Sequence, residues 1–467
     1  NQKKYSEAIH CFEKALKIEP SNEKAHINLC DILIQLKKPD KTISQLKRFL
    51  EVKPKSFLTS HMLGQTLEEI GTIDEAINYY KLAIKNNPNY YPPINNLGII
   101  YTNKGEFEKA LEIFKKGIQI CEKSEQKNNP GQIANIRSSN SEIFNNMGIA
   151  FAEMANPKEA IKAFNKVIML KPNDADAQFN KSLALLKTED FENGWPLYDW
   201  RWKTPEFSGK YLITSKCKWE PGNNNRVLLW QEQGIGDKIL FAALIPELNQ
   251  LCSKLIVQTE PRLISIFKRS FPNNIEFRSI KETIPEEEFD AHIPSASLPE
   301  YFRPNLQSFV KTEQGWLFPD KRRVKRLRKT LLGESSDLLI GISWTTLLND
   351  KNKNNITKKK RIIPLEQLAL TLNEPKVKLI NLQYGDVSYE INQLAKKFGI
   401  EIIQIPEIDN KEDIDGLSAL ICACDQIVSI DNTTVHLAGA LGKKTQALLA
   451  YSCFWSWGKR RKKSHWH

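Results

Sequence analysis

The sequence predicts two fold classes in one chain, an all-α helical repeat array followed by an α/β region made of two halves. Two observations lead to this prediction. In the first half, small and apolar residues recur at a fixed interval, which is typical of helix-turn-helix solenoids. In the second half, short apolar runs alternate with helical patterns, which predicts parallel strands joined by helical crossovers.

Three prolines mark the repeat period of the first half. Pro20, Pro54 and Pro88 stand 34 positions apart, and a proline at this point ends the second helix of each unit. Small residues at Gly64 and Gly98 suit the close approach of paired helices. Other positions that keep the interval are Ala8, Thr42, Ala76 and Ala110, and Phe12, Leu46, Tyr80 and Phe114.

These units resemble the tetratricopeptide repeat. We expect a solenoid over residues 1–194 with about six repeats, the first of them incomplete. An insertion near 121–140 is expected to lengthen two helix ends around a loop. Because repeat arrays commonly present a concave binding surface, we favour a protein partner in the groove over a role in spacing or dimerisation alone.

A tryptophan-rich junction, residues 195–225, follows the repeats. Its first segment contains Trp195, Tyr198, Trp200 and Trp202. These side chains suit either a stacking platform for a sugar or base, or a structural wedge between the repeats and the next domain. Because aromatic residues bury large areas, the wedge is the favoured interpretation.

The α/β region divides into an acceptor-side half, residues 226–320, and a donor-side half, residues 321–467, with a connector at 303–336. Ligands of parallel sheets bind beyond the carboxyl ends of the strands, so we expect a cleft between the two halves. A helix is expected at 238–250. Strands are expected at 227–230, 255–258, 275–277 and 289–293, and then at 338–343, 377–382, 400–403, 426–430 and 445–449.

The first candidate site is the glycine-containing turn after the strand at 227–230. Gly234 and Gly236 allow a tight turn into a helix, and Asp237 follows at the helix start. The turn is not a dinucleotide-binding fingerprint, because Ile239 replaces the third glycine. Asp237 suits a general base that takes a proton from an acceptor hydroxyl, or else a helix cap, and the local sequence leaves both open.

The second candidate site follows the strand at 426–430. A strand that runs directly into a capped helix N-terminus is an anion-binding arrangement, and an arginine nearby suits a diphosphate. The predicted ligand-binding residues are Asp431, Thr433, Thr434 and His436 in this loop, Ser343 and Gln383 at two other strand ends, and Arg361 before the next helix.

The chain carries 67 Lys and Arg against 55 Asp and Glu, a formal net charge of +12. Much of this excess lies in basic runs at 321–329, 351–361 and 459–463, which we interpret as solvated faces and loops. Attraction of an anionic donor, an acidic acceptor or an anionic membrane surface is the alternative. No nucleic-acid module accompanies the charge, so nucleic acid is not an expected partner.

The eight cysteines are scattered and form no Cys-x-x-Cys pair, which fits a reducing cytosol and argues against a zinc site. No window holds the roughly 18 uninterrupted apolar residues of a transmembrane helix. We expect a cytoplasmic protein, with peripheral membrane association as an alternative. Because the chain starts at Asn1 partway through a helical pattern, we also expect a fragment cut at both ends.

The two loops together resemble a known enzyme family. Gly-Ile-Gly-Asp237 resembles the acceptor-side loop of heptosyltransferase-like glycosyltransferases, glycosyltransferase family nine. Asp431-x-x-x-x-His436-Leu-Ala-Gly-Ala-Leu-Gly resembles their donor-side loop. With the repeats and the tryptophan-rich junction in front, the chain is similar to bacterial tetratricopeptide-repeat glycosyltransferases, whose layout is related to that of the O-linked N-acetylglucosamine transferases.

The resemblance implies a GT-B fold of two Rossmann-like halves and inverting, metal-independent transfer of a sugar to a protein or glycan acceptor. The donor would be a nucleotide-diphosphate sugar, with no further cofactor. By motif position, the resemblance implies that Asp237 is the catalytic base and that Arg361 contacts phosphate. It implies donor contacts for the residues of the second loop, Asp431, Thr433, Thr434 and His436.

One departure from the family pattern limits what is carried over. Heptosyltransferases commonly have Thr-Gly after the motif Asp, whereas this chain has Asn432-Thr433. The identity of the donor sugar is therefore not transferred. The alternative function is a tetratricopeptide-repeat interaction scaffold whose glycosyltransferase-like region is inactive.

Overall fold

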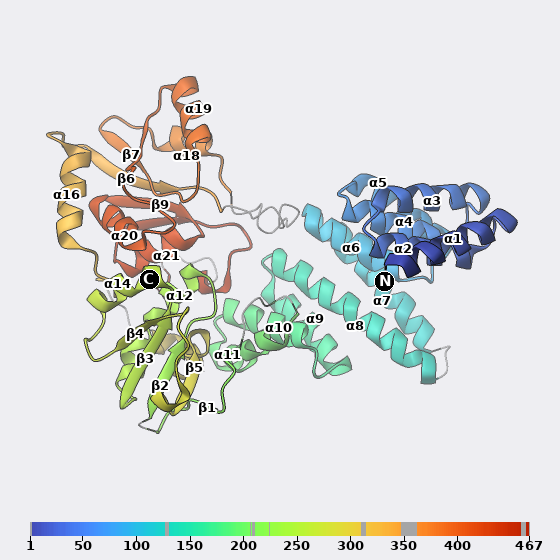
Figure 1. Ribbon diagram of the computed structural model, residues 1–467, viewed down its shortest axis with the longest axis horizontal. Coiled ribbons are helices and arrows are strands. Elements are labelled where there is room, and N and C mark those ends of the chain that lie inside the picture. Colours follow the sequence, from blue (N-terminus) through green and yellow to red (C-terminus); the bar gives the residue numbers. More distant parts are fainter. Residues whose placement is uncertain are drawn as a thin grey trace. The chain divides into compact units, whose positions relative to one another are not determined.

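The computed structural model describes residues 2–126, 130–205, 207, 211–223, 225–309, 314–346, 362–458 and 464–466 (Figure 1). The chain forms two compact units, Asn1–Ala177 and Gln178–His467. The described part of the first unit is helical, and the second unit contains two β-sheets. The predicted combination of a helical array with an α/β region is therefore confirmed.

The first unit is an array of paired helices. α2 packs on α3, α4 on α5, α6 on α7 and α8 on α9, and each pair contacts the next. α1 precedes the first pair, as expected for an incomplete repeat. The helices are α1 (Gln2–Ile18), α2 (Glu23–Gln35), α3 (Pro39–Val52), α4 (Phe57–Glu69), α5 (Ile73–Asn86), α6 (Pro92–Lys104), α7 (Phe107–Glu125), α8 (Pro130–Glu153), α9 (Pro157–Leu170) and α10 (Ala175–Lys187), which begins in this unit.

A glycine that faces a buried aromatic ring recurs in three of these pairs. A Cβ atom added to the glycine would lie within 2.6 Å of a ring atom in every case. The absence of a side chain therefore lets the two helices of a repeat approach, as the sequence predicts. The three pairs are Gly64 with Tyr80, Gly98 with Phe114, and Gly148 with Phe164.

The insertion near 121–140 is largely helical in the described residues. α7 continues to Glu125, and α8 begins at Pro130. Both helices are longer than the 13 or 14 residues of most of their neighbours, at 19 and 24 residues. The insertion thus lengthens two helix ends, as expected from the sequence.

The second unit begins at residue 178, earlier than the predicted solenoid end at residue 194. Most of α10 and all of α11 (Phe191–Tyr198) account for the difference, because Leu186 of α10 lies in one buried cluster with the aromatic residues of α11. Trp195 and Tyr198 are buried in a cluster with Leu240 and Phe241 of the α/β region. Burial of these two rings favours the structural role of the junction over a stacking platform.

The second unit contains two five-stranded sheets in which every pairing is parallel. Their strand orders are β1-β5-β2-β3-β4 and β10-β9-β6-β7-β8. The predicted strands are confirmed, and β1 is an addition that the sequence did not suggest. The strands are β1 (Cys217–Lys218), β2 (Arg226–Trp230), β3 (Lys254–Thr259), β4 (Glu276–Ser279), β5 (Ala291–Pro294), β6 (Leu338–Ser343), β7 (Val377–Asn381), β8 (Ile402–Ile403), β9 (Gln426–Ile430) and β10 (Thr445–Leu448).

In both sheets the direction of winding reverses next to a central strand. β3 and β4 lie on one side of β2, and β5 lies on the other. In the second sheet, β7 and β8 lie on one side of β6, and β9 lies on the other. A ligand-binding crevice forms at the carboxyl ends of strands that flank such a reversal. The loops after β2 and β9, which carry the two sequence motifs, both stand at reversal points.

One helical prediction for the second unit is wrong. The single helix expected at 238–250 is broken into α12 (Ile235–Ala242) and α13 (Ile245–Asn249), because Pro246 suits the first turn of a new helix. The expected connector contains α16 (Lys321–Leu332), whose Leu327 and Leu331 are buried. The other α-helices are α14 (Pro261–Ser270), α15 (Pro299–Phe302), α18 (Leu365–Leu372), α19 (Ser388–Phe398), α20 (Ile414–Ala423) and α21 (Thr433–Ala440).

The two halves of the second unit share one hydrophobic core. It joins Leu255 and Val257 of the first sheet to Leu417 and Ile427 of the second half. A common core fixes the two sheets, and the loops at their ends, in one packing arrangement. Among the helices that the structure describes, none is both long and apolar enough to cross a bilayer.

Candidate functional site

The two motif loops meet directly. α12, which follows β2, packs on α21, which follows β9 (Figure 1). A Cβ atom added to Gly236 would lie 3.0 Å from Cδ2 of His436 and 3.8 Å from Cα of Thr433. Gly236 therefore lets the first turns of α12 and α21 approach, a role beyond the tight turn predicted for it. The predicted acceptor-side and donor-side loops are neighbours in space.

Asp237 lies in the first turn of α12. The N-cap of this helix is Gly234, so Asp237 is the third helical residue. Its Oδ2 lies 3.5 Å from the position that a Cβ atom of Gly234 would occupy. A carboxylate at this position interacts favourably with the helix N-terminus, so the capping role and the general-base role remain compatible with the geometry.

Asp431 and His436 lie together at the start of α21. Nε2 of His436 is 3.6 Å from Oδ1 of Asp431, and both side chains are buried for the most part. The His436 ring also stacks on the indole of Trp457, with ring centroids 5.3 Å apart. The imidazole is thus held between a carboxylate and an aromatic face, where its orientation is restricted.

Asn432 caps α21. Its side-chain oxygen accepts a hydrogen bond from the Thr434 N–H at 3.0 Å, and its Nδ2 donates to Ser343 Oγ at 2.8 Å. This asparagine therefore ties the second motif loop to the end of β6. Thr434 is buried, whereas Thr433 is partly exposed. Of these two threonines, Thr433 has the more accessible surface for a ligand.

Ser343 and Gln383, which the sequence suggested as ligand contacts, hydrogen-bond within the protein. Oε1 of Gln383 accepts from Ser343 Oγ at 2.9 Å and from the backbone N–H groups of Trp344 and Thr345 at 3.0 Å each. Ser343 is 0 % exposed and Gln383 is 1 % exposed. Their arrangement supports a role in shaping the loop after β6, and direct contact with a ligand stays a prediction.

A cavity of about 320 Å³ opens beside this loop. It lies between the residues that follow β6 and the helices α18 and α19. Its lining combines aromatic, acidic and basic side chains, among them Trp344, Tyr389, Glu390 and Lys397. Arg361, the predicted phosphate contact, lies outside the described residues.

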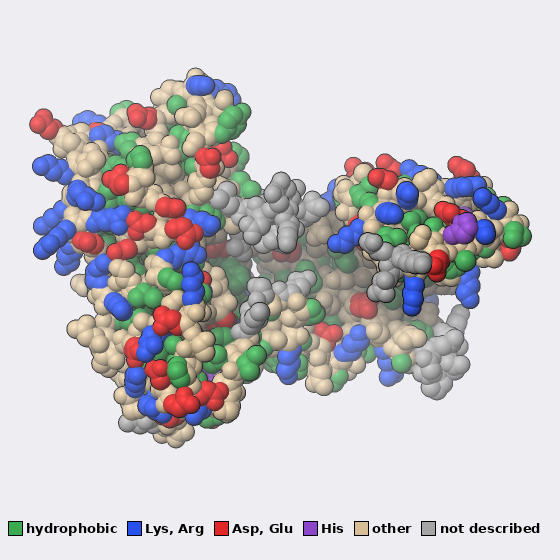
Figure 2. Space-filling model, in the orientation of Figure 1, with side chains coloured by type: hydrophobic (Ala, Val, Ile, Leu, Met, Phe, Trp, Pro, Cys, Tyr) green, Lys and Arg blue, Asp and Glu red, His purple; other side chains and the backbone are tan. Residues whose placement is uncertain are grey.

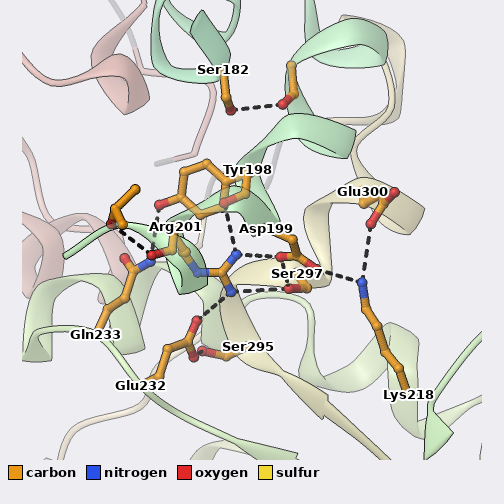
Figure 3. A network of polar contacts seen from close by, with 12 residues as sticks. Ser182, Tyr198, Asp199, Arg201, Lys218, Glu232, Gln233, Ser295, Ser297 and Glu300 are labelled. Carbon is orange, nitrogen blue, oxygen red and sulfur yellow. Dashed lines mark hydrogen bonds and ion pairs between the residues drawn. The ribbon is translucent and has the colours of Figure 1, made fainter. Parts of the chain in front are cut away.

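A buried ion network joins the junction to the first motif loop (Figure 3). Arg201, which is 0 % exposed, donates to Glu232 Oε1 at 2.9 Å, to Ser297 at 3.1 Å and to Asp199. Lys218 donates to the other oxygen of Asp199 at 2.7 Å. Sequence reasoning missed this network, although Arg201 stands between two tryptophans and Glu232 immediately precedes the motif turn.

Burial and the neighbouring cations shift the pKa values of the two carboxyl groups in this network in opposite directions. Burial raises the pKa of Glu232, and the Arg201 guanidinium opposes this shift. For Asp199, burial is outweighed by the attraction of Arg201 and Lys218, which lowers its pKa. The Arg201 guanidinium also lies over the rings of Tyr198 and Trp202, at 4.9 and 4.6 Å from their centroids. The segment that leads to Asp237 is therefore anchored at Glu232.

A further contact extends this anchoring. Nε2 of Gln233 donates to the Tyr198 hydroxyl at 3.1 Å. Burial raises the pKa of Tyr198, Arg201 lowers it, and the charge of Asp237 raises it further, so the phenol and this carboxylate are electrostatically coupled. Among the described residues, no group of three or more His, Cys, Asp or Glu side chains is arranged to hold a metal ion.

Three protein-family models match parts of the repeat half of the chain. The model for "Tetratricopeptide repeat" matches residues 79–112 and again residues 141–174. The model for "Anaphase-promoting complex, cyclosome, subunit 3" matches residues 1–83.

Relatives of known name align with the repeats and, in one case, with most of the chain. Protein FlbA of Caulobacter vibrioides is 24% identical over 456 residues, which are 94% of this chain and 73% of that protein. Anaphase-promoting complex subunit 3 of Schizosaccharomyces pombe is 24% identical over 123 residues, which are 26% of this chain and 18% of that protein. None of the families and relatives named here is described as a glycosyltransferase.

Among solved structures, MamA is 25% identical and covers 37% of this chain and 92% of its own, with a TM-score of 0.31. The family matches, together with the helix pairs and their glycine–aromatic contacts, define the first half of the chain. This half is an array of tetratricopeptide repeats.

Proposed function

We propose that the second unit transfers a sugar from a nucleotide-diphosphate donor to a protein or glycan acceptor, in an inverting and metal-independent reaction on a GT-B fold. We further propose that the repeat array binds the acceptor or a partner protein. One observation supports this function above others. Two parallel sheets place their reversal-point loops against each other, with Gly236 of one loop in contact distance of His436 of the other.

The proposed chemistry divides between the two loops. Asp237 takes the proton from the acceptor hydroxyl while the acceptor oxygen forms a bond to the anomeric carbon. The bond between that carbon and the diphosphate oxygen breaks on the opposite face, and the nucleoside diphosphate leaves. The residues proposed to hold the donor are Asp431, Thr433, Thr434 and His436 at the N-terminus of α21, with Arg361 neutralising phosphate charge and with Ser343 and Gln383 shaping the site.

The reaction is tested on the full chain with a panel of nucleotide sugars. Isothermal titration calorimetry identifies a donor, and Asp237→Asn is then expected to abolish turnover while donor affinity changes little. Asp386→Asn, which alters an exposed carboxylate, is the matched control and should retain turnover. Unchanged turnover in the Asp237 variant would refute the assignment of the base.

The second candidate function is an interaction scaffold whose α/β unit lacks catalytic activity. The family matches favour it, because all three fall within residues 1–174. The first helices of successive repeats also carry amide side chains, and Asn146 donates to Asn95 at 2.9 Å. Asn145 of α8 is itself partly exposed, so we propose that a bound peptide contacts its amide.

A peptide-library screen with the full chain separates the two functions. If the protein is an interaction scaffold, a peptide from the library should bind and Asn145→Ala should weaken that binding. Calorimetry should then detect no binding of a nucleotide sugar. Binding of a nucleotide sugar followed by Asp237-dependent turnover would instead support the enzyme.

A further inference from the structure

α16 presents a stripe of cations to solvent. Lys321, Arg322, Lys325, Arg326 and Lys329 are all exposed, and Figure 2 shows basic side chains gathered along the edge where α16 lies. At 3.6 residues per turn, these five positions fall within an arc of roughly 140° along a helix about 18 Å long. They form one face of the helix, which we call the basic stripe.

Other side chains of α16, outside the basic stripe, hold the helix on the protein. Arg323 pairs with Asp413, and Arg328 donates to the Ala423 carbonyl at 2.7 Å and to Asp425 at 2.8 Å. These two arginines fix the helix against both ends of α20, through Asp413 before it and through Ala423 and Asp425 at its end. The basic stripe is therefore displayed on a rigid support rather than on a loop.

The basic stripe does not stabilise the fold. Within the described ranges, none of its five side chains forms an ion pair with the protein. Lys321 and Lys325 are four residues apart, as are Arg322 and Arg326, so like charges repel along the helix. Two of the cations lie in the first turn, where the helix dipole also disfavours positive charge. An anionic partner would relieve these repulsions.

We propose that the basic stripe binds the anionic surface of a phospholipid membrane. A face of cations on a fixed surface helix matches a plane of anionic headgroups. Exposed apolar side chains flank the helix in the sequence, with Phe318 47 % exposed before it and Leu338 43 % exposed after it. Such apolar groups suit the boundary between headgroups and acyl chains.

Vesicle co-sedimentation of the full chain tests the proposal. The protein should pellet with vesicles that contain about 30 % phosphatidylglycerol, not with pure phosphatidylcholine vesicles, and 0.5 M salt should release it. The triple variant Lys325→Gln, Arg326→Gln, Lys329→Gln should lower the partition coefficient about a hundredfold, at roughly fivefold per cation.

A variant of equal net charge provides the matched control. Lys14→Gln, Lys81→Gln, Lys115→Gln removes three exposed cations from the repeat unit and should leave vesicle binding within about twofold of the wild type. Equal losses in both variants would overturn the proposal, as would absent binding to anionic vesicles. Binding to poly-glutamate or to DNA without vesicle binding would also overturn it and identify a different class of partner. Circular dichroism melts confirm that each variant folds.

Discussion

At the scale of single residues, the candidate site depends on the close approach of the Gly236 backbone to the His436 ring. His436 has little freedom to retreat, because it stacks on Trp457 and lies beside Asp431. The absence of a side chain at Gly236 therefore allows α12 and α21 to approach as closely as they do. Gly234, two residues earlier, has no such neighbour and meets only the Asp237 carboxylate at ordinary contact distance.

This contrast predicts different costs for one substitution at the two glycines. Gly236→Ser should lower the free energy of unfolding of the second unit by about 1–3 kcal/mol, because the added atoms overpack the contact with His436. Gly234→Ser should cost less than about 0.5 kcal/mol, since serine suits an N-cap and meets no close neighbour. Chemical denaturation measures both, and equal losses would contradict the packing argument.

A second residue-scale prediction concerns His61 in α4. Burial lowers its pKa from 6.5 to about 4. Because the unfolded chain then binds the proton more readily, stability should be fully present above about pH 6.5 and decline as the pH falls toward 4. In thermal unfolding experiments, the melting temperature of the His61→Gln variant should vary less with pH over this range than that of the wild type. The exposed His10→Gln should leave the pH dependence as in the wild type.

At the scale of elements, the ends of β6, β7 and β9 are held by one set of polar contacts. Gln383 after β7 supports the loop after β6, and Asn432 after β9 donates to Ser343 of β6. The loops that the sequence treats as separate candidates are thus parts of one supported edge. The polar residues at these strand ends stabilise this edge of the sheet through hydrogen bonds within the protein.

Gln383→Ala tests this interpretation. The change should lower the free energy of unfolding by about 2–3 kcal/mol, because two buried backbone N–H groups, of Trp344 and Thr345, lose their acceptor. Gln393→Ala on the exposed face of α19 is the matched control and should stay within about 0.5 kcal/mol. A loss below 1 kcal/mol for Gln383→Ala would show that another group replaces the acceptor.

At the scale of the whole second unit, the buried ion network connects the junction to the first sheet. Arg201 comes from the segment after α11, Glu232 from the turn after β2 and Ser297 from the segment after β5. Desolvated charges of this kind are stable only while they remain paired. The junction therefore belongs to the α/β unit in energetic terms as well as in packing.

Glu232→Gln should accordingly destabilise the second unit by about 3–5 kcal/mol, since it leaves the Arg201 guanidinium buried with less compensating charge. The same change at Glu366, whose ion pair with Lys397 is exposed, should cost no more than about 1 kcal/mol. Denaturant titrations of both variants measure the difference. Similar losses of unfolding free energy in the two variants would contradict the argument that burial makes the Arg201–Glu232 pair costly to break.

The sequence by itself determined the repeats, the parallel strands and the two motif loops, because these follow from local periodicity and turn chemistry. The 34-residue interval predicts the paired helices, and Gly64 and Gly98 predict their close approach, which the structure contains. The apolar runs predict the strands closely, from β2 to β10. Such features depend on residues that are neighbours in the chain, so no long-range information is needed to recognise them.

Only the tertiary structure decided which distant residues meet. The contact of Gly236 with His436 joins positions 200 residues apart, and the pairing of Arg201 with Glu232 joins a helical segment to a strand end. It also assigned α11 to the second unit, where Trp195 is buried. The physical reason is that packing and desolvation depend on every neighbour in space, and local sequence patterns do not contain that information.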